Sequence, residues 1–364
     1  MKRALLAFAL LLCSAVLQAQ SLDPNATLKA YAAKVLPRCA DATVTFEAST
    51  APGPTNFQSN IMTVRSSDQY CGTRKYVLYS PKSQAVLIGS VIELPKDNRP
   101  ANVRISEEAT RLLSKQVTAN VAPFPLADGL KVVTIVHPTP YGPFAYNGFL
   151  DASGQFLVVG FRGTLTTEPA RTLRESLGST NAARRGNAAK VEILELSDFQ
   201  CPTCARAHEQ IEPIIKKNLA KVNYARLDLP LFEHHEWSLP AAMAARAIQR
   251  VAPDKYWQYV DFVFKNQESI GKQKIDDVIK NWVEDNDVDK AAFQKIYGSK
   301  SERQALLDQV SRAFAVGVAS TPTYLVNGQI MGFGPDGAFT MDAINKALGL
   351  PPTAPKKKTT PAAK

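Results

Sequence analysis

The chain has 364 residues, of which 45% are hydrophobic and 21% charged, and its formal net charge is +10. This length predicts two domains rather than one. Two basic residues lie at the amino terminus and four lysines in the last fourteen residues, which leaves about +4 for the part between them. So small an excess argues against a nucleic-acid partner, and the lack of a second long apolar run argues against stable membrane insertion.

The two ends of the chain are predicted to lie outside the folded part. Lys2 and Arg3 precede an apolar run over residues 4–17, and Leu17-Gln18-Ala19 suits a cleavage site. Residues 1–19 therefore resemble a secretory signal peptide, which predicts an exported, periplasmic or otherwise extracytoplasmic protein. Residues 351–364 are rich in Pro, Ala, Thr and Lys without any acid, which is typical of a disordered basic tail.

Residues 20–165 are predicted to form an α+β domain. Its expected helices cover residues 28–36 and 106–117, the second capped by Ser106. Expected strands cover residues 43–47, 76–79, 85–94, 130–136, 146–151 and 156–163. Residues 83–89 and 154–160 resemble each other as a turn followed by a strand. Chance similarity between two strands of one sheet and an internal duplication both remain open.

Cys39 and Cys71 lie in this first domain. Their spacing fits no zinc or redox motif, so a structural disulfide between them is the prediction for an exported chain. In the chain-entropy model it would contribute about 3–4 kcal/mol. A second redox pair is the alternative, and the lack of a predicted helix start beside either cysteine disfavours it.

Residues 166–188 are polar and are predicted to be a linker, with a short helix over residues 169–177. The second domain covers residues 189–350, with expected strands at 191–197 and 222–229 and a helix at 204–219 between them. A helical insertion follows at about 230–314, with expected helices at 240–251, 255–267, 274–286, 289–297 and 300–314. Strands at 323–326 and 329–332 flank Asn327-Gly328, a strong hairpin signal, and a helix at 341–348 closes the domain.

The sequence Cys201-Pro202-Thr203-Cys204 lies where the first of these strands gives way to its helix. Pro202 suits the first helical position, which places Cys201 at the helix cap. Free N–H groups and the helix dipole favour a thiolate there, so Cys201 is expected to have a lowered pKa. Cys204, one turn later, would be the resolving sulfur of a pair that exchanges through a mixed disulfide.

Glu195 is a single carboxylate in a strand that is expected to be buried. A buried carboxylate is costly unless it is paired or has a chemical role, and here it could take and return the Cys204 proton. The alternative is a glutamate at the strand edge that reaches solvent. Zinc bound by the two cysteines with His208, His234 and His235 is a weaker alternative, because structural zinc sites usually have more sulfur ligands or a regular His spacing.

The sequence DFQCPTC, together with Glu195 and the distant GVASTPTYLVNG, resembles the DsbA-like thiol:disulfide oxidoreductases. The resemblance covers about residues 189–350. It implies an α/β thioredoxin fold with a helical insertion, here preceded by a separate α+β domain. It also implies a cis peptide bond before Pro322, with Thr321 and Pro322 holding an extended substrate segment beside Cys201.

This resemblance implies an enzyme without metal or cofactor that acts on cysteines of other exported proteins and exchanges electrons with a redox partner protein. Disulfide formation is the expected direction. Thr321 and the additional first domain leave an isomerase or reductase open, because a strand of that domain weakly resembles the dimerisation domains of periplasmic disulfide isomerases; a homodimer is a candidate assembly. A non-redox, chaperone-like binding module is the alternative from another class.

Overall fold

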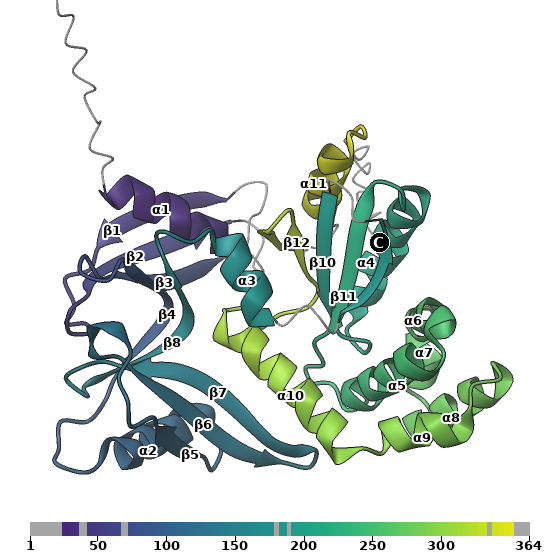
Figure 1. Cartoon of the computed structure of the whole chain (residues 1–364), viewed down its shortest axis with the longest axis horizontal. Coiled ribbons are helices and arrows are strands. Elements are labelled where there is room, and N and C mark those ends of the chain that lie inside the picture. Colours follow the sequence, from purple (N-terminus) through teal and green to yellow (C-terminus); the bar gives the residue numbers. More distant parts are fainter. Residues whose placement is uncertain are drawn as a thin grey trace, which may run out of the picture.

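The computed structural model describes residues 24–35, 42–66, 72–177, 182–187, 191–332 and 337–352. These residues form two β-sheets that lie beside each other, each covered by helices (Figure 1). An α/β thioredoxin-like half therefore follows a separate sheet-rich half with helices, as the sequence predicts. Residues 1–23 and 353–364, and with them the predicted signal peptide and most of the predicted tail, lie outside the described residues.

The first sheet has eight strands, all paired antiparallel, in the order β1-β2-β3-β4-β8-β7-β6-β5. The strands are β1 (Thr43–Ala48), β2 (Gln58–Arg65), β3 (Thr73–Tyr79), β4 (Ala85–Glu93), β5 (Thr118–Val121), β6 (Lys131–Thr139), β7 (Gly142–Leu150) and β8 (Phe156–Thr164). Helix α1 (Pro24–Val35) precedes the first four strands, and α2 (Ala101–Leu113) precedes the last four.

This order is a helix followed by a four-stranded meander, formed twice. A shift of 71 residues superimposes the bounds of β4 on those of β8 and the end of β3 on the end of β7. The central strands pair reciprocally, since Leu94 N donates to Gln155 O at 2.8 Å and its counterpart Leu165 N donates to Gln84 O at 3.0 Å. The local similarity in the sequence is therefore part of a pseudo-two-fold repeat that covers the first domain.

The axis of this repeat passes between Gly89 and Gly160, which pair directly with each other. A Cβ atom on Gly89 would lie 2.1 Å from Val159 O, and one on Gly160 would lie 2.2 Å from Ile88 O. Gly160 also has a φ of +157°, a conformation that glycine adopts without strain. Both positions therefore require glycine because the two backbones approach closely there.

The second sheet has five strands in the order β13-β12-β10-β11-β9. They are β9 (Ala183–Gly186), β10 (Val191–Ser197), β11 (Val222–Asp228), β12 (Thr323–Val326) and β13 (Gln329–Gly332). Strands β10 and β11 are parallel, joined by helix α4 (Pro202–Lys217), and the other pairs are antiparallel. Helices α4 and α11 (Ala338–Leu348) share one apolar cluster with these strands.

The predicted helical insertion is present between β11 and β12. Its helices are α5 (Ser238–Val251), α6 (Tyr256–Lys265), α7 (Gln267–Ile270), α8 (Ile275–Asp285), α9 (Lys290–Tyr297) and α10 (Lys300–Ala315). Helix α10 leaves the second half and lies across β7 of the first sheet (Figure 1). There Asn147 Nδ2 donates to Ser311 Oγ at 3.1 Å, and the Phe144 and Phe314 rings pack edge to face.

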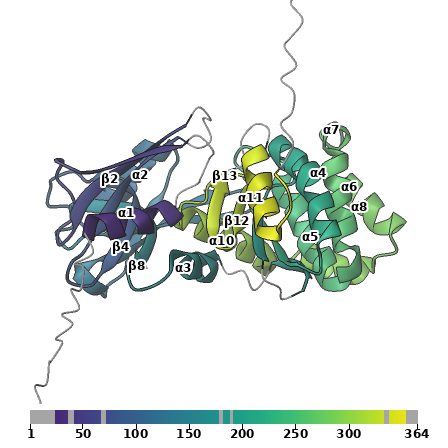
Figure 2. The ribbon, with the colours of Figure 1, turned by 90° about the horizontal axis from the view of Figure 1, so that it is seen from above.

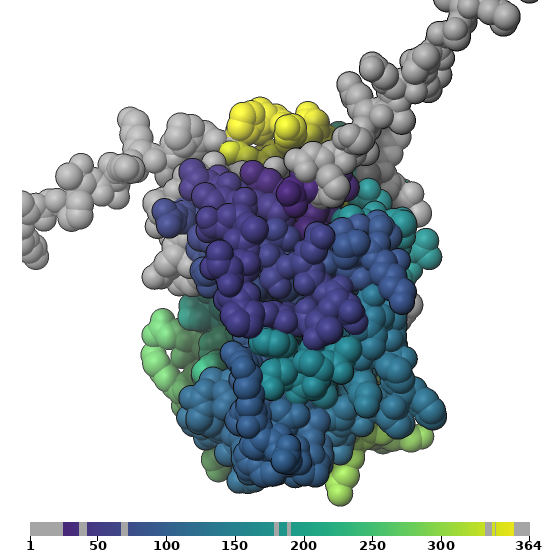
Figure 3. All heavy atoms as spheres, turned by 90° about the vertical axis from the view of Figure 1, so that its left-hand side faces the viewer, coloured from purple at the N-terminus to yellow at the C-terminus, as the bar shows by residue number. Residues whose placement is uncertain are grey.

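The two halves share one continuous apolar core, which runs from α1 and β2 to β4 through α10 to the insertion helices. Seen from above, α3 (Pro169–Leu177), α10 and the β12–β13 hairpin lie between the first sheet and the group of helices from α4 to α8 (Figure 2). From the side of the first sheet, residues of the first half form most of the coloured surface (Figure 3). The halves are thus packed together rather than joined by the chain alone.

The structure differs from the sequence-based prediction in a few places. Helix α2 begins after Pro100 rather than at Ser106, whose hydroxyl donates to Asn102 O inside the helix. The predicted linker contains α3, as expected, and also β9, which pairs with β11. Strands β2 and β5 were not predicted, and β2 is a full member of the first sheet.

Candidate active site

The Cys201–Cys204 pair lies at the junction between β10 and α4. Helix α4 starts at Pro202, and Cys201 is its N-cap, with φ −71° and ψ 120°. Cys204 N and Ala205 N donate to Cys201 O at 3.0 and 3.2 Å, which closes the first helical turn. The predicted placement of the pair at a helix start is confirmed.

The two sulfur atoms have different surroundings. Cys204 is 0% exposed and Cys201 is 7% exposed, and both are free thiols. A hydrogen bond from Cys204 lowers the pKa of the Cys201 thiol to about 6, although burial opposes the shift. Burial raises the pKa of Cys204 well above its ordinary value, and the neighbouring Cys201 sulfur adds to the increase. Cys201 is therefore the sulfur that ionises and Cys204 the one that keeps its proton.

These shifts predict a titration. In the reduced protein, the rate of Cys201 alkylation should reach half its maximum near pH 6, so that Cys201 is largely thiolate at pH 7. Cys204→Ala should move this midpoint upward, because it removes the hydrogen bond that is the main cause of the shift. Cys201→Ser provides the blank for any other reactive cysteine. A wild-type midpoint near the ordinary cysteine value would contradict the prediction.

The same titration affects stability. Because the Cys201 pKa is lower in the folded than in the unfolded chain, its stabilising contribution is fully present above the unfolded pKa. That contribution disappears as the pH falls through about 6. Reduced protein should therefore lose stability relative to oxidised protein, which has no free thiols at this site, as the pH is lowered from about 9 to 6.

Glu195 is 1% exposed, so it is a buried carboxylate and not a strand-edge residue that reaches solvent. Tyr224 OH donates to its Oε2, and Arg226 Nε lies 3.8 Å from Oε1. Glu195 and Ser197 lie on the same face of β10, because side chains alternate along a strand. The Ser197 hydroxyl lowers the pKa of Cys204, although burial dominates the shift of that thiol.

Arg226 pairs with Glu195 inside the domain. Its side chain is 0% exposed, and it also forms an ion pair with Asp228 and donates to Tyr256 OH at 3.2 Å. Its guanidinium lies over the Phe199 ring, 4.2 Å from the centroid. Burial alone would lower the pKa of Arg226, but Asp228 and the other polar neighbours hold it well above the ordinary value. The buried carboxylates therefore have a buried cation beside them.

Asp198 and His235 form a second charged pair beside the cysteines. Asp198 is 1% exposed, and its Oδ2 lies 2.8 Å from His235 Nδ1. The hydrogen bond to Asp198 raises the pKa of His235, and the charge of Cys201 adds to the increase. Asp198 in turn raises the pKa of Cys201.

The Thr321–Pro322 peptide bond is cis, as the resemblance implies. It precedes β12, the strand that pairs with β10. The Cys201 sulfur lies 3.5 Å from Thr321 O. The structure thus brings Thr321 to the cysteine pair, although it lies 120 positions from Cys201 in the chain.

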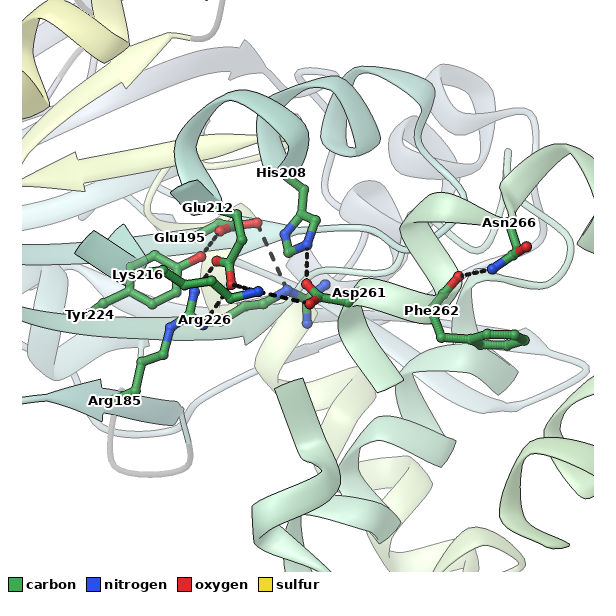
Figure 4. A network of polar contacts seen from close by, with 10 residues as sticks. All are labelled: Arg185, Glu195, His208, Glu212, Lys216, Tyr224, Arg226, Asp261, Phe262 and Asn266. Atoms are coloured by element: carbon green, nitrogen blue, oxygen red, sulfur yellow. Dashed lines mark hydrogen bonds and ion pairs between the residues drawn. The ribbon is translucent and has the colours of Figure 1, made fainter. Parts of the chain in front are cut away.

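His208 and His235, two of the candidate zinc ligands, have separate partners. His208 Nε2 lies 2.7 Å from Asp261 Oδ1, in a network where Lys216 joins Asp261 to Glu212 and Arg185 (Figure 4). His235 bonds to Asp198 on another side of the helix start. No group of three or more potential metal ligands occurs within the described ranges. Cys39 and Cys71 lie outside those ranges, so their predicted disulfide stays a prediction.

Sequence reasoning missed Arg226 and Asp198, and it considered His235 only as a zinc ligand and not as the partner of Asp198. Arg226 could have been found by the argument applied to Glu195, because it too is a single charge in an apolar strand. Asp198 and His235 carry no such signal, since both lie in polar turns. Gln267 was also missed; its side-chain amide donates to Cys201 O at 3.1 Å from α7.

A parallel β–α–β unit extended by an antiparallel hairpin, with a cysteine pair at the start of its first helix, defines a thioredoxin-fold domain. Residues 180–349 match the family model described as thioredoxin. The second half of the chain therefore has a thioredoxin fold and matches the thioredoxin family model.

Curated relatives cover parts of the chain. A "Probable disulfide bond formation protein D" from Bacillus cereus is 28% identical over 176 residues, 47% of this chain and 80% of the relative. "Na(+)/H(+) antiporter NhaA 3" from Salinispora tropica is 24% identical over 202 residues, 52% of this chain. The match spans 29% of that antiporter's length.

Two solved structures are similar to a little under half of the chain. Wolbachia pipientis alpha-DsbA1 is 18% identical with a TM-score of 0.41, and the match covers 47% of this chain and 92% of that one. BdbD from Bacillus subtilis in its oxidised form is 20% identical with a TM-score of 0.39, covering 46% and 94%. Among the helices that the structure describes, none has the length and apolar character needed to span a membrane.

Proposed function

We propose that this chain is an exported thiol–disulfide oxidoreductase that introduces disulfides into other exported proteins. The observation that carries the proposal is the asymmetry of the pair, with an ionisable Cys201 at the helix start and a fully buried, protonated Cys204 behind it. A stabilised Cys201 thiolate favours the reduced form of the pair, which makes its disulfide an oxidant.

The proposed organisation of the chain follows from this function. Residues 1–19 serve as signal peptide, residues 20–165 as first domain, 166–188 as connection, 189–350 as redox domain and 351–364 as tail.

The reaction begins with the oxidised Cys201–Cys204 pair. A substrate thiolate attacks Cys201 Sγ, which forms a mixed disulfide and breaks the Cys201–Cys204 bond. The released Cys204 sulfur takes up a proton, for which Glu195 is the proposed donor. A second substrate thiolate then attacks the substrate sulfur of the mixed disulfide and expels Cys201 as a stable thiolate. The substrate has lost two electrons, the pair has gained them, and a redox partner protein reoxidises it.

Thr321 and Pro322 are proposed to hold the substrate. Thr321 O faces the attacking sulfur at 3.5 Å, where an extended backbone segment can reach both groups. Pro322 lacks an N–H and so presents no donor at this position.

The deciding experiment supplies the oxidised full chain with a reduced, unfolded protein that contains two cysteines. We expect stoichiometric disulfide formation without added oxidant, and catalysis when an oxidant regenerates the pair. A scrambled substrate tests the alternative: an isomerase restores its activity when the chain is supplied reduced. Failure of the oxidised chain to transfer its disulfide would contradict the proposal, and protection of a client without any exchange would favour the binding module.

A further inference from the structure

The segment of residues 231–236, between β11 and α5, contacts the active site on one side and the first domain on the other. On the active-site side, Leu231 N donates to Asp198 Oδ2 at 2.7 Å. His235 Nδ1 lies 2.8 Å from the same oxygen. Asp198 O in turn accepts from Cys201 N at 3.2 Å, so this segment holds the turn that carries the attacking sulfur.

On its other side the segment is held by the β6–β7 hairpin of the first domain. The Phe232 ring packs edge to face on Tyr141 and Phe144, with centroid distances of 5.9 and 5.3 Å. Tyr141 OH donates to Glu236 O at 3.2 Å. Figure 1 shows this hairpin extending from the first sheet toward the helices of the insertion.

Charged groups of the first domain also meet this segment. Lys115 forms an ion pair with Glu233, and His137 Nε2 lies 3.3 Å from the same carboxylate oxygen. His137 is 3% exposed, so the first domain turns a buried imidazole toward the segment. Residues 232, 233 and 236 are therefore held by the first domain, while 231 and 235 are held by Asp198.

His235 is the member of the segment that interacts electrostatically with Cys201, whose charge raises the pKa of the imidazole. Asp198 is a buried anion beside Cys201 and disfavours a second negative charge there. A protonated His235 neutralises Asp198 only while its ring stays against that carboxylate. Because flanking residues on both sides of His235 are anchored to the first domain, that domain restricts where the ring can lie.

We propose that the first domain is a positioning element for the redox pair, and that it acts through residues 231–236 by holding His235 against Asp198. This proposal rests on the redox function proposed above. Phe232 and Tyr141 are positioning residues in this scheme, and His235 supplies the positive charge beside Cys201.

The test uses the reduced full chain and measures the Cys201 thiolate fraction as a function of pH, together with the equilibrium constant of the pair with glutathione. His235→Gln should lower the thiolate fraction near pH 6 about three- to tenfold, since the charge of Asp198 is then uncompensated. The equilibrium should shift toward the disulfide by a similar factor. Phe232→Ala should shift both readouts in the same direction by a smaller factor, about twofold or more.

Matched control variants distinguish a specific effect of the segment on Cys201 from a general loss of packing. His208→Gln removes an imidazole of α4 that bonds to the Asp261 carboxylate and lies outside the segment of residues 231–236. Phe262→Ala removes a half-buried ring of the insertion. Both should leave the two readouts within experimental error. If Phe232→Ala fails to fold, Tyr141→Phe, which keeps the ring and removes its bond to Glu236, takes its place.

The outcomes are distinct. Unchanged readouts in His235→Gln overturn the proposal, and a shift in His235→Gln without one in Phe232→Ala or Tyr141→Phe overturns the part assigned to the first domain. A wild-type chain without an ionised cysteine or any exchange with glutathione would refute the redox function itself, whatever the variants do.

Discussion

Cys201→Ser should abolish thiol–disulfide exchange by this chain, because a serine hydroxyl is neither ionised near neutral pH nor able to form a disulfide. Exchange proceeds by attack on, or by, the Cys201 sulfur, the less buried of the two, because Cys204 is fully buried and protonated. The measurement is the rate of disulfide transfer to a reduced substrate protein. The expected result is the uncatalysed background rate.

Cys204→Ser is the matched variant, since it keeps the attacking sulfur and removes the resolving one. Mixed with a substrate disulfide, it should accumulate a covalent complex through Cys201 that is visible on a non-reducing gel. Cys201→Ser should trap none. Exchange that persists in Cys201→Ser would contradict the assignment of Cys201 as the attacking sulfur. The activity would then belong to Cys39, Cys71 or Cys204, the other cysteines of the predicted mature chain.

The second large effect is expected at Arg226. Arg226→Met introduces an apolar side chain that still fills much of the same space. It leaves Glu195 and Asp228 buried without their cation. Removing one partner of a buried charged pair costs about 3–5 kcal/mol of unfolding free energy. Urea unfolding of the reduced protein, in which Cys204 rather than Glu195 holds the proton, measures it, and the loss should shrink as the pH falls, because protonated carboxyls need no cation.

Arg250→Met is the control, because Arg250 pairs with Glu302 at the surface with 47% of its side chain exposed. Exposed ion pairs contribute about 0–1 kcal/mol, so this variant should remain close to wild type. If Arg226→Met were also within about 1 kcal/mol of wild type, the buried carboxylates would be neutral in the folded protein rather than paired.

The second domain was largely predictable from its sequence. Local signals fix its elements: the bounds of β10, β12 and β13 agree with the prediction, because apolar runs end there at a cysteine pair, a proline or an Asn-Gly turn. The cysteine pair is detectable for the same reason, since its chemistry depends on a helix that starts directly after Cys201. The cis bond before Pro322 followed from the resemblance and not from the residues.

What could not be predicted depends on contacts between distant segments. His235 contacts Asp198 although the two residues are 37 positions apart, and no residue pattern in either turn predicts this contact. In the first domain, β2 was missed because its burial is set by neighbours on both sides rather than by a regular alternation of its own residues. The repeat was visible only where β4 and β8 begin, since the helices and outer strands of the two halves differ in position relative to them.

The pairing of Gly89 with Gly160 restricts how the first domain can change in length. An extra residue in either central strand would slide the other half along it, and the two glycines would then face residues with side chains. Such an insertion would also turn every later side chain of that strand to the opposite face. Insertions should therefore be tolerated in the outer turns of each half, whereas β4 and β8 can lengthen only in concert.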